Sequence, residues 1–233
     1  MIPQATPPQI DIAGRRIGPR EAPFIIAELS ANHLGDIDRA LRSIAVAARS
    51  GADAVKLQTY TADTLTLDSD KEVFKVKGGL WDGQTLYELY QSAYTPYDWH
   101  ERLFAAARDE GIIAFSSPFD QTAVDLLAGL DAPAYKIASF EIVDLPLIAA
   151  VARLGKPMII STGMANLAEI HQAVAAARDN GACELALLHC TSGYPTPFAA
   201  AVPGVWSDRP VTTPNASARC GMVRRLASAN GVG

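Results

Sequence analysis

The sequence predicts an α/β fold, a TIM-type (β/α)8 barrel that is incomplete, with about six β/α units present. Short apolar runs alternate with amphipathic stretches of helical period, and this alternation implies parallel strands joined by right-handed crossovers. An open doubly wound sheet would show the same alternation. However, no G-x-G-x-x-G segment follows a predicted strand, and polar residues gather at the carboxyl ends of the strands, where a barrel carries its chemistry. The barrel is therefore favoured.

Composition narrows the class of protein further. The chain has 233 residues, of which 49% are apolar and 19% charged, with a net charge of −5. This is ordinary globular composition, and the acidic balance gives no global attraction to nucleic acid or to a membrane. No apolar stretch is long enough to span a bilayer, and residues 1–10 do not resemble a signal peptide. Because Cys183, Cys190 and Cys220 also follow no zinc spacing, we expect a cytoplasmic protein.

Three regions follow one another along the chain. Residues 1–22 form an N-terminal extension in which apolar residues flank Gly14, as in a short β-hairpin that caps the fold. Residues 23–197 carry the partial barrel, and residues 198–233 form an atypical tail. Six strands are expected, at residues 24–29, 54–60, 112–117, 134–139, 158–162 and 185–191. Helices are expected at residues 37–50, 96–110, 120–130, 145–154 and 167–180.

Local signals mark the ends of several helices. Gly51 and Gly111 each follow a predicted helix, as glycines at helix C-termini do. Asn166, with Glu169 three residues later, resembles a capping box at the start of the last helix. Residues 61–95, which follow the second strand, are expected to be a long polar connection.

Two strands each place a single lysine in an apolar run: Lys56 in AVKLQTY and Lys136 in AYKIASFE. A buried ammonium group is unfavourable unless an anion meets it. For either lysine alone, an edge strand whose side chain reaches solvent is an equal alternative. Because the pattern occurs twice, it suggests that one anion binds between the two strands.

The strand ends add further polar groups to this predicted site. Period-two alternation places Lys56 with Gln58 on one face of their strand, and Phe115 with Ser117 on one face of theirs. The inventory suits a phosphorylated carboxylate ligand, with Glu28 as an acid, a base or an acceptor for sugar hydroxyls. A lone hydroxyl at a strand end is more often a helix N-cap. The polar residues at the strand ends are Glu28, Lys56, Gln58, Ser116, Ser117, Lys136, Ser139, Ser161, Thr162, His189 and Thr191.

The histidines and tyrosines have competing interpretations. His33 follows the first strand and either orders the site or is simply solvated. Surface positions are expected for His100 and His171, because both fall in predicted helices, whereas His189 and its neighbour Cys190 are expected to pack in the core. An aromatic cluster either lines a sugar site or anchors the long connection, and anchoring is favoured. Its members are Trp81, Tyr87, Tyr90, Tyr94 and Tyr97.

Six segments together resemble the sialic acid synthase family, and they occur in the family's order. They are AELSANH (27–33), VKLQTY (55–60), SSPFD (116–120), YKIASFE (135–141), ISTGM (160–164) and LLHCTSGYPTP (187–197). Within the family, SANH, KIASFE and LWDGQTLYELYQSAYTP (80–96) are similar to the pseudaminic acid synthase branch. Sialic and legionaminic acid synthases typically carry a KIGSGE-like form in place of KIASFE.

The resemblance implies a transferase that condenses phosphoenolpyruvate with an amino sugar, releasing phosphate and forming a nonulosonic acid. In the pseudaminic branch the sugar is 2,4-diacetamido-2,4,6-trideoxy-altropyranose. The matching motifs imply that phosphoenolpyruvate is bound by a set close to Gln58, and that Glu28, Glu141 and Tyr194 face the sugar, the two glutamates as catalytic residues. The family is homodimeric and uses Mn²⁺ or Mg²⁺ to polarise the sugar aldehyde. The phosphoenolpyruvate set is Lys56, Ser117, Lys136, Ser139 and Ser161.

The tail departs from the family pattern. After Pro197 the family continues with two strands that carry metal-binding histidines and with an antifreeze-like domain, and residues 198–233 match neither. We therefore expect a truncated or frameshifted product with a disordered tail, no metal ligands, and unpaired edges at the first and sixth strands. Two alternatives stay open besides a pseudaminic acid synthase: an N-acetylneuraminate or legionaminic acid synthase, and a non-catalytic fragment.

Overall fold

The computed structural model describes residues 9–190 and 225–227, which divide between two compact units. The 25–132 unit is continuous in sequence. The 133–190 unit also includes residues 9–24 and the short strand at residues 225–227. Thr191 and Tyr194, and the predicted tail apart from that strand, lie outside the described residues.

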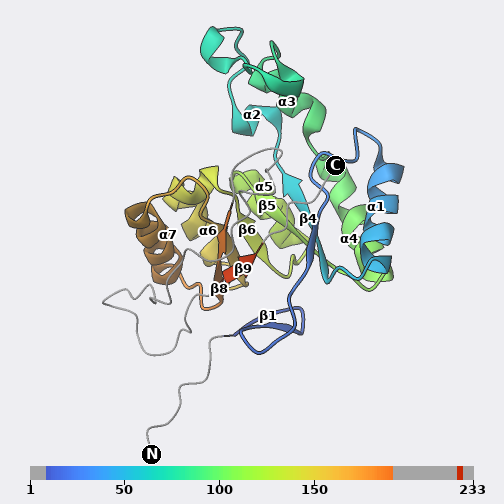
Figure 1. Cartoon of the computed structure of the whole chain (residues 1–233), viewed down its shortest axis with the longest axis vertical. Helices are drawn as coiled ribbons and strands as arrows, with labels where there is room; N and C mark the ends of the chain where they lie inside the picture. Colours follow the sequence, from blue (N-terminus) through green and yellow to red (C-terminus); the bar gives the residue numbers. More distant parts are fainter. Residues whose placement is uncertain (1–8, 191–224, 228–233) are drawn as a thin grey trace, which may run out of the picture. The chain divides into compact units, whose positions relative to one another are not determined.

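Three parallel strands form the sheet of the 25–132 unit, and their bounds lie close to those predicted (Figure 1). They are β3 (Ile26–Glu28), β4 (Ala54–Thr59) and β5 (Ile113–Pro118). Glu28 lies opposite Lys56, and Gln58 lies opposite Ser117. Polar side chains therefore gather at one end of this sheet.

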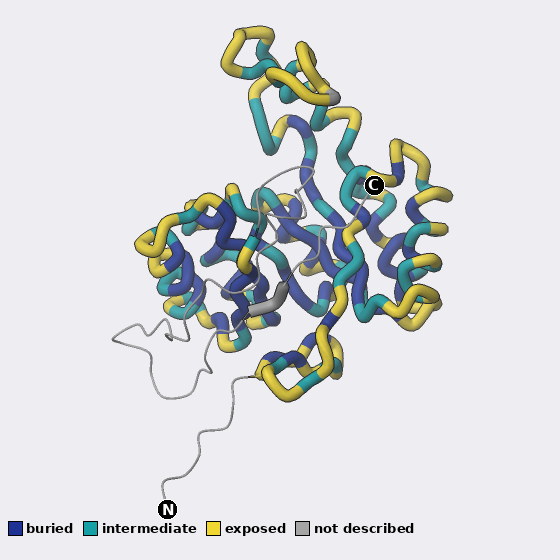
Figure 2. Tube along the Cα trace, in the orientation of Figure 1, coloured by how far each residue is buried: buried dark blue, intermediate teal, exposed yellow. Residues whose placement is uncertain are grey.

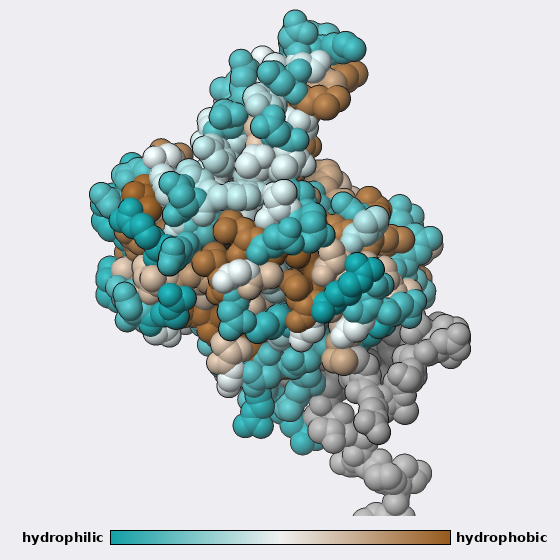
Figure 3. Space-filling view, turned by 180° about the vertical axis from the view of Figure 1, so that it is seen from behind, coloured by the Kyte–Doolittle hydropathy of each residue, from teal (hydrophilic) through white to brown (hydrophobic). Residues whose placement is uncertain are grey.

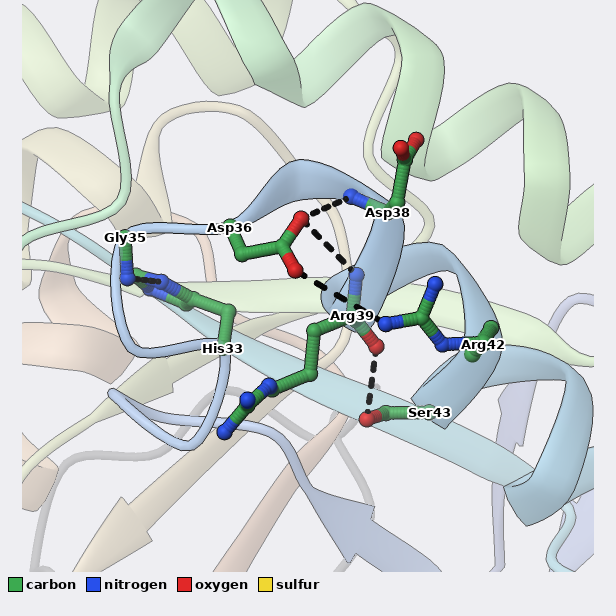
Figure 4. Close-up of polar contacts among 7 residues, drawn as sticks. All are labelled: His33, Gly35, Asp36, Asp38, Arg39, Arg42 and Ser43. Atoms are coloured by element: carbon green, nitrogen blue, oxygen red, sulfur yellow. Dashed lines mark hydrogen bonds and ion pairs between the residues drawn. The ribbon is translucent and has the colours of Figure 1, made fainter.

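Three main helices follow these strands, and α1 and α4 pack against each other. They are α1 (Ile37–Arg49), α4 (His100–Asp109) and α5 (Gln121–Gly129). The side chain of Asp36 begins α1 by accepting hydrogen bonds from the backbone N–H groups of Asp38 and Arg39 (Figure 4). Arg42, about one helical turn after Arg39, pairs with the other carboxylate oxygen of Asp36 at 3.7 Å. Helix α1 buries Ala40 and Ile44.

The predicted polar connection is a lobe with helices of its own, which corrects that expectation. The lobe contains α2 (Ala62–Leu65), η1 (Glu72–Phe74), η2 (Gly79–Trp81) and α3 (Leu86–Ala93). A capping box between Thr85 and Glu88 begins α3, and η3 (Tyr97–Trp99) leads from the lobe into α4. The lobe is largely exposed, whereas β4 and β5 of its unit are mostly buried (Figure 2). Apolar side chains gather at its far end (Figure 3).

The 133–190 unit contains four parallel strands and three helical segments. The strands are β6 (Tyr135–Ile137), β7 (Met158–Ser161), β8 (Leu185–His189) and β9 (Arg225–Ala227). The helical segments are η4 (Phe140–Val143), α6 (Leu145–Ala152) and α7 (Leu167–Asp179). All four residues of β7 are buried, as expected for a parallel strand covered on both faces. The predicted capping box between Asn166 and Glu169 is confirmed.

The predicted hairpin is confirmed in the same unit. It consists of β1 (Ile10–Ile12) and β2 (Arg15–Ile17), which pair antiparallel. Ala13 and Gly14 both have positive φ, 51° and 83°, as the two central residues of a type I′ turn require. The backbone N–H of Asp11 donates to Oε1 of Glu184 at 2.7 Å, which ties the hairpin to the loop before β8.

Strand β9 corrects one expectation about the tail. It runs parallel to β8, with Leu187 opposite Arg225 and His189 opposite Ala227. The sixth predicted strand is therefore paired on this side, and the expectation of an unpaired edge there was wrong. Among residues 9–190 and 225–227, no helix is long and apolar enough to cross a membrane.

Candidate active site

A buried lysine forms the centre of the candidate site in the 25–132 unit. The side chain of Lys56 is only 9% exposed, and its Nζ lies 2.5 Å from Oε2 of Glu28. Nζ also donates to Oγ of Ser117 at 3.5 Å. The strand register explains these contacts. Glu28 on β3 lies opposite Lys56 on β4. Ser117 on β5 lies opposite Gln58, which shares a face of β4 with Lys56 because the two are two residues apart. Two of the predicted site residues are thus direct neighbours of Lys56, and their role in binding an anion stays a prediction.

Gln58 continues the same face of β4 towards the carboxyl end. Its Oε1 accepts a hydrogen bond of 2.8 Å from Oγ of Ser30, in the loop after β3. Ser30 has a positive φ of 43°, an unusual conformation for a residue other than glycine, and it marks the point where the chain turns away from β3. The sequence analysis did not single out Ser30, because its partner is remote in sequence.

The second lysine lies in the other unit. Lys136 is half-buried on β6, and Ser139 follows it just before η4. Ser139 occupies the N-cap position of η4, but its side chain makes no capping hydrogen bond. Ser161, at the end of β7, is 2% exposed and is not a cap, since Asn166 caps the following helix. The hydroxyl of Thr162 donates to the carbonyl oxygen of Leu188 at 2.9 Å, so it stabilises the pairing of β7 with β8.

Glu141 is a half-buried carboxyl group in η4. Burial raises its pKa above the ordinary value, against the opposing effects of its own backbone N–H and of the Lys136 charge. Within the part of the chain that the structure describes, its Oε2 is buried without a hydrogen-bond partner. A carboxyl group whose pKa is raised in this way suits proton transfer.

The described geometry assembles one part of the predicted site and leaves another part as a prediction. Lys56 contacts both Glu28 and Ser117, and Gln58 lies on the same face of β4 as Lys56. Lys136, Ser139, Glu141 and Ser161 belong to the 133–190 unit, and their convergence with Lys56 stays a prediction. Tyr194 lies outside the described residues.

The predictions for His100 and His189 need correction, and one of the two alternatives for His33 is excluded. His33 is fully buried and not solvated, with Nε2 3.1 Å from Oγ1 of Thr95. His100 is also fully buried and not on the surface, because Thr59 and Pro96 bind its two ring nitrogens. His189 is exposed and not in the core, while His171 is exposed as predicted. Cys190 is half-buried.

The aromatic residues mainly anchor the lobe, as favoured. Tyr87 donates from its hydroxyl to Oδ1 of Asp63 at 3.0 Å, joining α3 to α2. The ring of Tyr90 packs edge-on against Tyr60, at the end of β4, with centroids 5.9 Å apart. Burial and the nearby Tyr90 raise the pKa of Tyr60 to about 12, so this tyrosine stays neutral. Trp81 differs from the others, because it is 49% exposed.

The described residues contain no cluster of side chains suited to coordinate a divalent metal ion. Within residues 9–190 and 225–227, no group of three or more His, Cys, Asp or Glu side chains is arranged to hold a metal ion. The Mn²⁺ or Mg²⁺ that the family uses therefore has no assigned ligands among these residues, and its binding stays a prediction. The chemistry proposed below rests on Lys56, Glu28 and their neighbours.

Known proteins resemble this chain in sequence and in structure. The sequence model of the NeuB family matches residues 43–202. Pseudaminic acid synthase from Campylobacter jejuni is 53% identical over 173 residues, which cover 74% of this chain and 50% of that protein. Pseudaminic acid synthase from Helicobacter pylori is 49% identical over 176 residues, covering 76% of this chain and 52% of that protein.

Among solved structures, an N-acetylneuraminic acid (sialic acid) synthetase from Leptospira borgpetersenii, crystallised with citrate, aligns with a TM-score of 0.73. It is 29% identical, and the alignment covers 83% of this chain and 62% of that one. This likeness confirms the predicted fold class, an incomplete (β/α) barrel. The chain spans about half the length of the two curated synthases.

Proposed function

Because this chain belongs to the NeuB family, we propose that it carries the phosphoenolpyruvate-binding part of a nonulosonic acid synthase of the pseudaminic acid type. The observation that carries this proposal is the burial of Lys56 at the carboxyl end of β4, with Glu28 and Ser117 as its partners. A buried ammonium group beside a serine hydroxyl suits an anionic ligand. The KIASFE segment and the two pseudaminic acid synthase relatives support the branch.

The proposed reaction joins phosphoenolpyruvate to the open-chain aldehyde of an amino sugar. In this proposal Lys56, Ser117, Lys136, Ser139 and Ser161 neutralise and orient the phosphate and carboxylate of phosphoenolpyruvate. Gln58 lies beside this set on β4. Water then attacks the cationic intermediate, and phosphate leaves. The sugar is 2,4-diacetamido-2,4,6-trideoxy-altropyranose.

The carboxylates are assigned to the sugar. Glu28 accepts hydrogen bonds from sugar hydroxyls once an anion replaces it on Lys56, and Tyr194 faces the same substrate. Glu141 is the candidate acid or base, since burial raises its pKa and leaves one oxygen buried without a partner among the described residues. Such a group holds its proton to a higher pH than an ordinary carboxyl group does, and it can transfer that proton to or from a sugar oxygen.

A second candidate function is anion binding without catalysis. It is favoured by the contacts of Lys56 with Glu28 and Ser117, which account for an anion site without requiring a catalytic group. In this case the chain binds phosphoenolpyruvate weakly, or associates with intact subunits.

Cys183 and Cys190 are free thiols, and for either function we place the protein in a reducing cytoplasm.

The test is phosphate release. The purified chain is incubated with phosphoenolpyruvate, Mn²⁺ and one of three sugars: the altrose-derived sugar, N-acetylmannosamine or the legionaminic acid precursor. We expect release with the altrose-derived sugar, lost in Lys56→Ala and kept in Lys77→Ala, a control at an exposed lysine of the lobe. Release with another sugar alone would move the assignment to a sialic or legionaminic acid synthase. No release with any sugar would contradict catalysis and support the second candidate.

A further inference from the structure

A chain of buried hydroxyls runs from β5 to the start of α4. Oγ of Ser116 lies 2.7 Å from Oγ1 of Thr59, which in turn lies 2.8 Å from Nε2 of His100. The other ring nitrogen of His100, Nδ1, lies 3.0 Å from the carbonyl oxygen of Pro96. Ser116, Thr59 and His100 are all fully buried. This chain connects β5, β4 and α4.

The chemistry of the partners sets the direction of these hydrogen bonds. A carbonyl oxygen can only accept, so Nδ1 of His100 must carry the proton and donate to Pro96. In the neutral ring Nε2 is then an acceptor, and Thr59 donates to it. The Thr59 oxygen accepts in turn from the hydroxyl of Ser116. A neutral His100 with its proton on Nδ1 therefore satisfies every member of the chain.

This chain lies on the reverse face of the strands that carry the proposed anion site. Thr59 adjoins Gln58, and Ser116 adjoins Ser117, but successive side chains of a strand point to opposite faces. Pro118, the last residue of β5, pairs with Thr59 and has no backbone N–H to donate to the ladder. The hydroxyl bond between Thr59 and Ser116 is thus a cross-strand connection where the backbone ladder ends.

A second buried histidine holds the segment that His100 binds. The backbone N–H of Gly35 donates to Nδ1 of His33 at 3.1 Å (Figure 4). Nε2 of His33 therefore carries the proton and donates to Oγ1 of Thr95 at 3.1 Å. The His33 ring also packs edge-on against Trp99, with centroids 5.5 Å apart. Residues 95–100 are thus fixed from both sides.

We infer that His100 is a positioning residue of the proposed anion site, acting through Thr59 and Ser116 to fix the carboxyl ends of β4 and β5. The inference rests on the proposed function, since it concerns the site of Lys56. His100 itself lies behind the sheet. Its effect is to keep Ser117 within reach of Nζ of Lys56, where the present distance of 3.5 Å is at the limit of a hydrogen bond.

The test compares Thr59→Val, which keeps the shape of the side chain and removes the hydroxyl, with Thr59→Ser, which keeps the hydroxyl. Isothermal titration calorimetry measures the Kd of phosphoenolpyruvate. We expect Thr59→Val to weaken binding by about tenfold, because it loosens Ser117 and one hydrogen bond between a charged group and its partner contributes about tenfold or more to binding. Thr59→Ser should bind like the wild type. Ser116→Ala, which removes only the end of the chain, serves as a second variant if Thr59→Val does not fold.

A spectroscopic measurement separates positioning from general stability. Imidazole ¹⁵N NMR of the wild type at pH 7.5 should show His100 neutral, with Nδ1 protonated, and Thr59→Val should shift its Nε2 resonance. His171→Gln, at an exposed position of α7, assigns the signals and should leave binding unchanged.

The outcomes distinguish the two proposals. If the wild type binds phosphoenolpyruvate and folded Thr59→Val and Ser116→Ala bind it equally well, the inference is overturned and the proposed function stands. A protonated His100, or one with its proton on Nε2, also overturns the inference. If the wild type binds no phosphoenolpyruvate, the proposed function fails and the inference fails with it.

Discussion

The ion pair between Lys56 and Glu28 is unequal in its exposure to water. The lysine side chain is 9% exposed and the glutamate side chain 40%, so Glu28 can exchange its partner for water more readily than Lys56 can. Lys56 is held within the sheet between β3 and β5. A ligand that brings a negative charge can therefore replace the carboxylate while the ammonium group stays in place.

Glu28→Gln should strengthen the binding of inorganic phosphate. The substitution removes a carboxylate that competes for Lys56, and it leaves a buried ammonium group in need of an anion. Calorimetry should show a lower Kd, and thermal unfolding should show a larger increase in Tm with phosphate than in the wild type. Glu72→Gln is the control, since Glu72 pairs with Lys75 on the exposed lobe. Unchanged phosphate binding in Glu28→Gln would contradict the role of Lys56.

The N-terminal end of α4 depends on neutral histidines. Burial lowers the pKa of His33 and of His100 below the ordinary value of 6.5, while the carbonyl of Pro96 and the charge of Asp98 oppose the shift at His100. Protonation of His33 at Nδ1 would direct an N–H group at the N–H of Gly35. The loop after β3 and the start of α4 therefore lose support when these rings become charged.

Stability should therefore fall as the pH falls below about 6.5. The unfolded chain binds protons on these histidines before the folded chain does, so their contribution is complete above pH 6.5 and is lost at lower pH. Urea unfolding at pH 7.5 and 5.5 measures the change. His100→Gln should reduce the pH dependence, and the exposed His171→Gln should not. Equal pH dependence in wild type and His100→Gln would show that His100 titrates normally.

Helix α7 should depend on its capping box. Oδ1 of Asn166 accepts from the N–H of Glu169 at 3.0 Å, and Glu169 accepts from the N–H of Asn166 at 2.8 Å. Asn166→Ala should lower the free energy of unfolding by about 1 kcal/mol. Asn166→Asp should retain most of it. Gln172→Ala, at an exposed position of the same helix, provides the baseline in urea unfolding. A loss no larger than this baseline would mean that the cap adds nothing.

Elements with strong periodicity could be predicted from the sequence, and elements set by long-range contacts could not. The six strands and their helices follow from apolar runs and caps such as Asn166. The helices α2 and α3 were not predicted because segments of four and eight residues are too short to show a helical period. His100 was placed on the surface because helical position alone does not show that the first turn of α4 faces Thr59.

At the scale of the whole molecule, each unit contributes one lysine from an apolar strand. Lys56 and Ser117 could be grouped from the sequence because strand alternation and register act within one sheet. The convergence of Lys56 with Lys136 depends on the arrangement of two units, which residue patterns do not determine. The proposed roles of Glu141 and Tyr194 towards the sugar stay predictions for the same reason.

The measurement that tests the central claim most directly is the calorimetric Kd of phosphoenolpyruvate for the wild type, Lys56→Ala, Lys136→Ala and the double variant. Each single variant should bind more than about tenfold more weakly, because a hydrogen bond to a charged group is worth about 1.5 to 3 kcal/mol. The two losses should not add in the double variant, since both lysines hold one ligand. Wild-type affinity in both single variants would contradict a shared anion site.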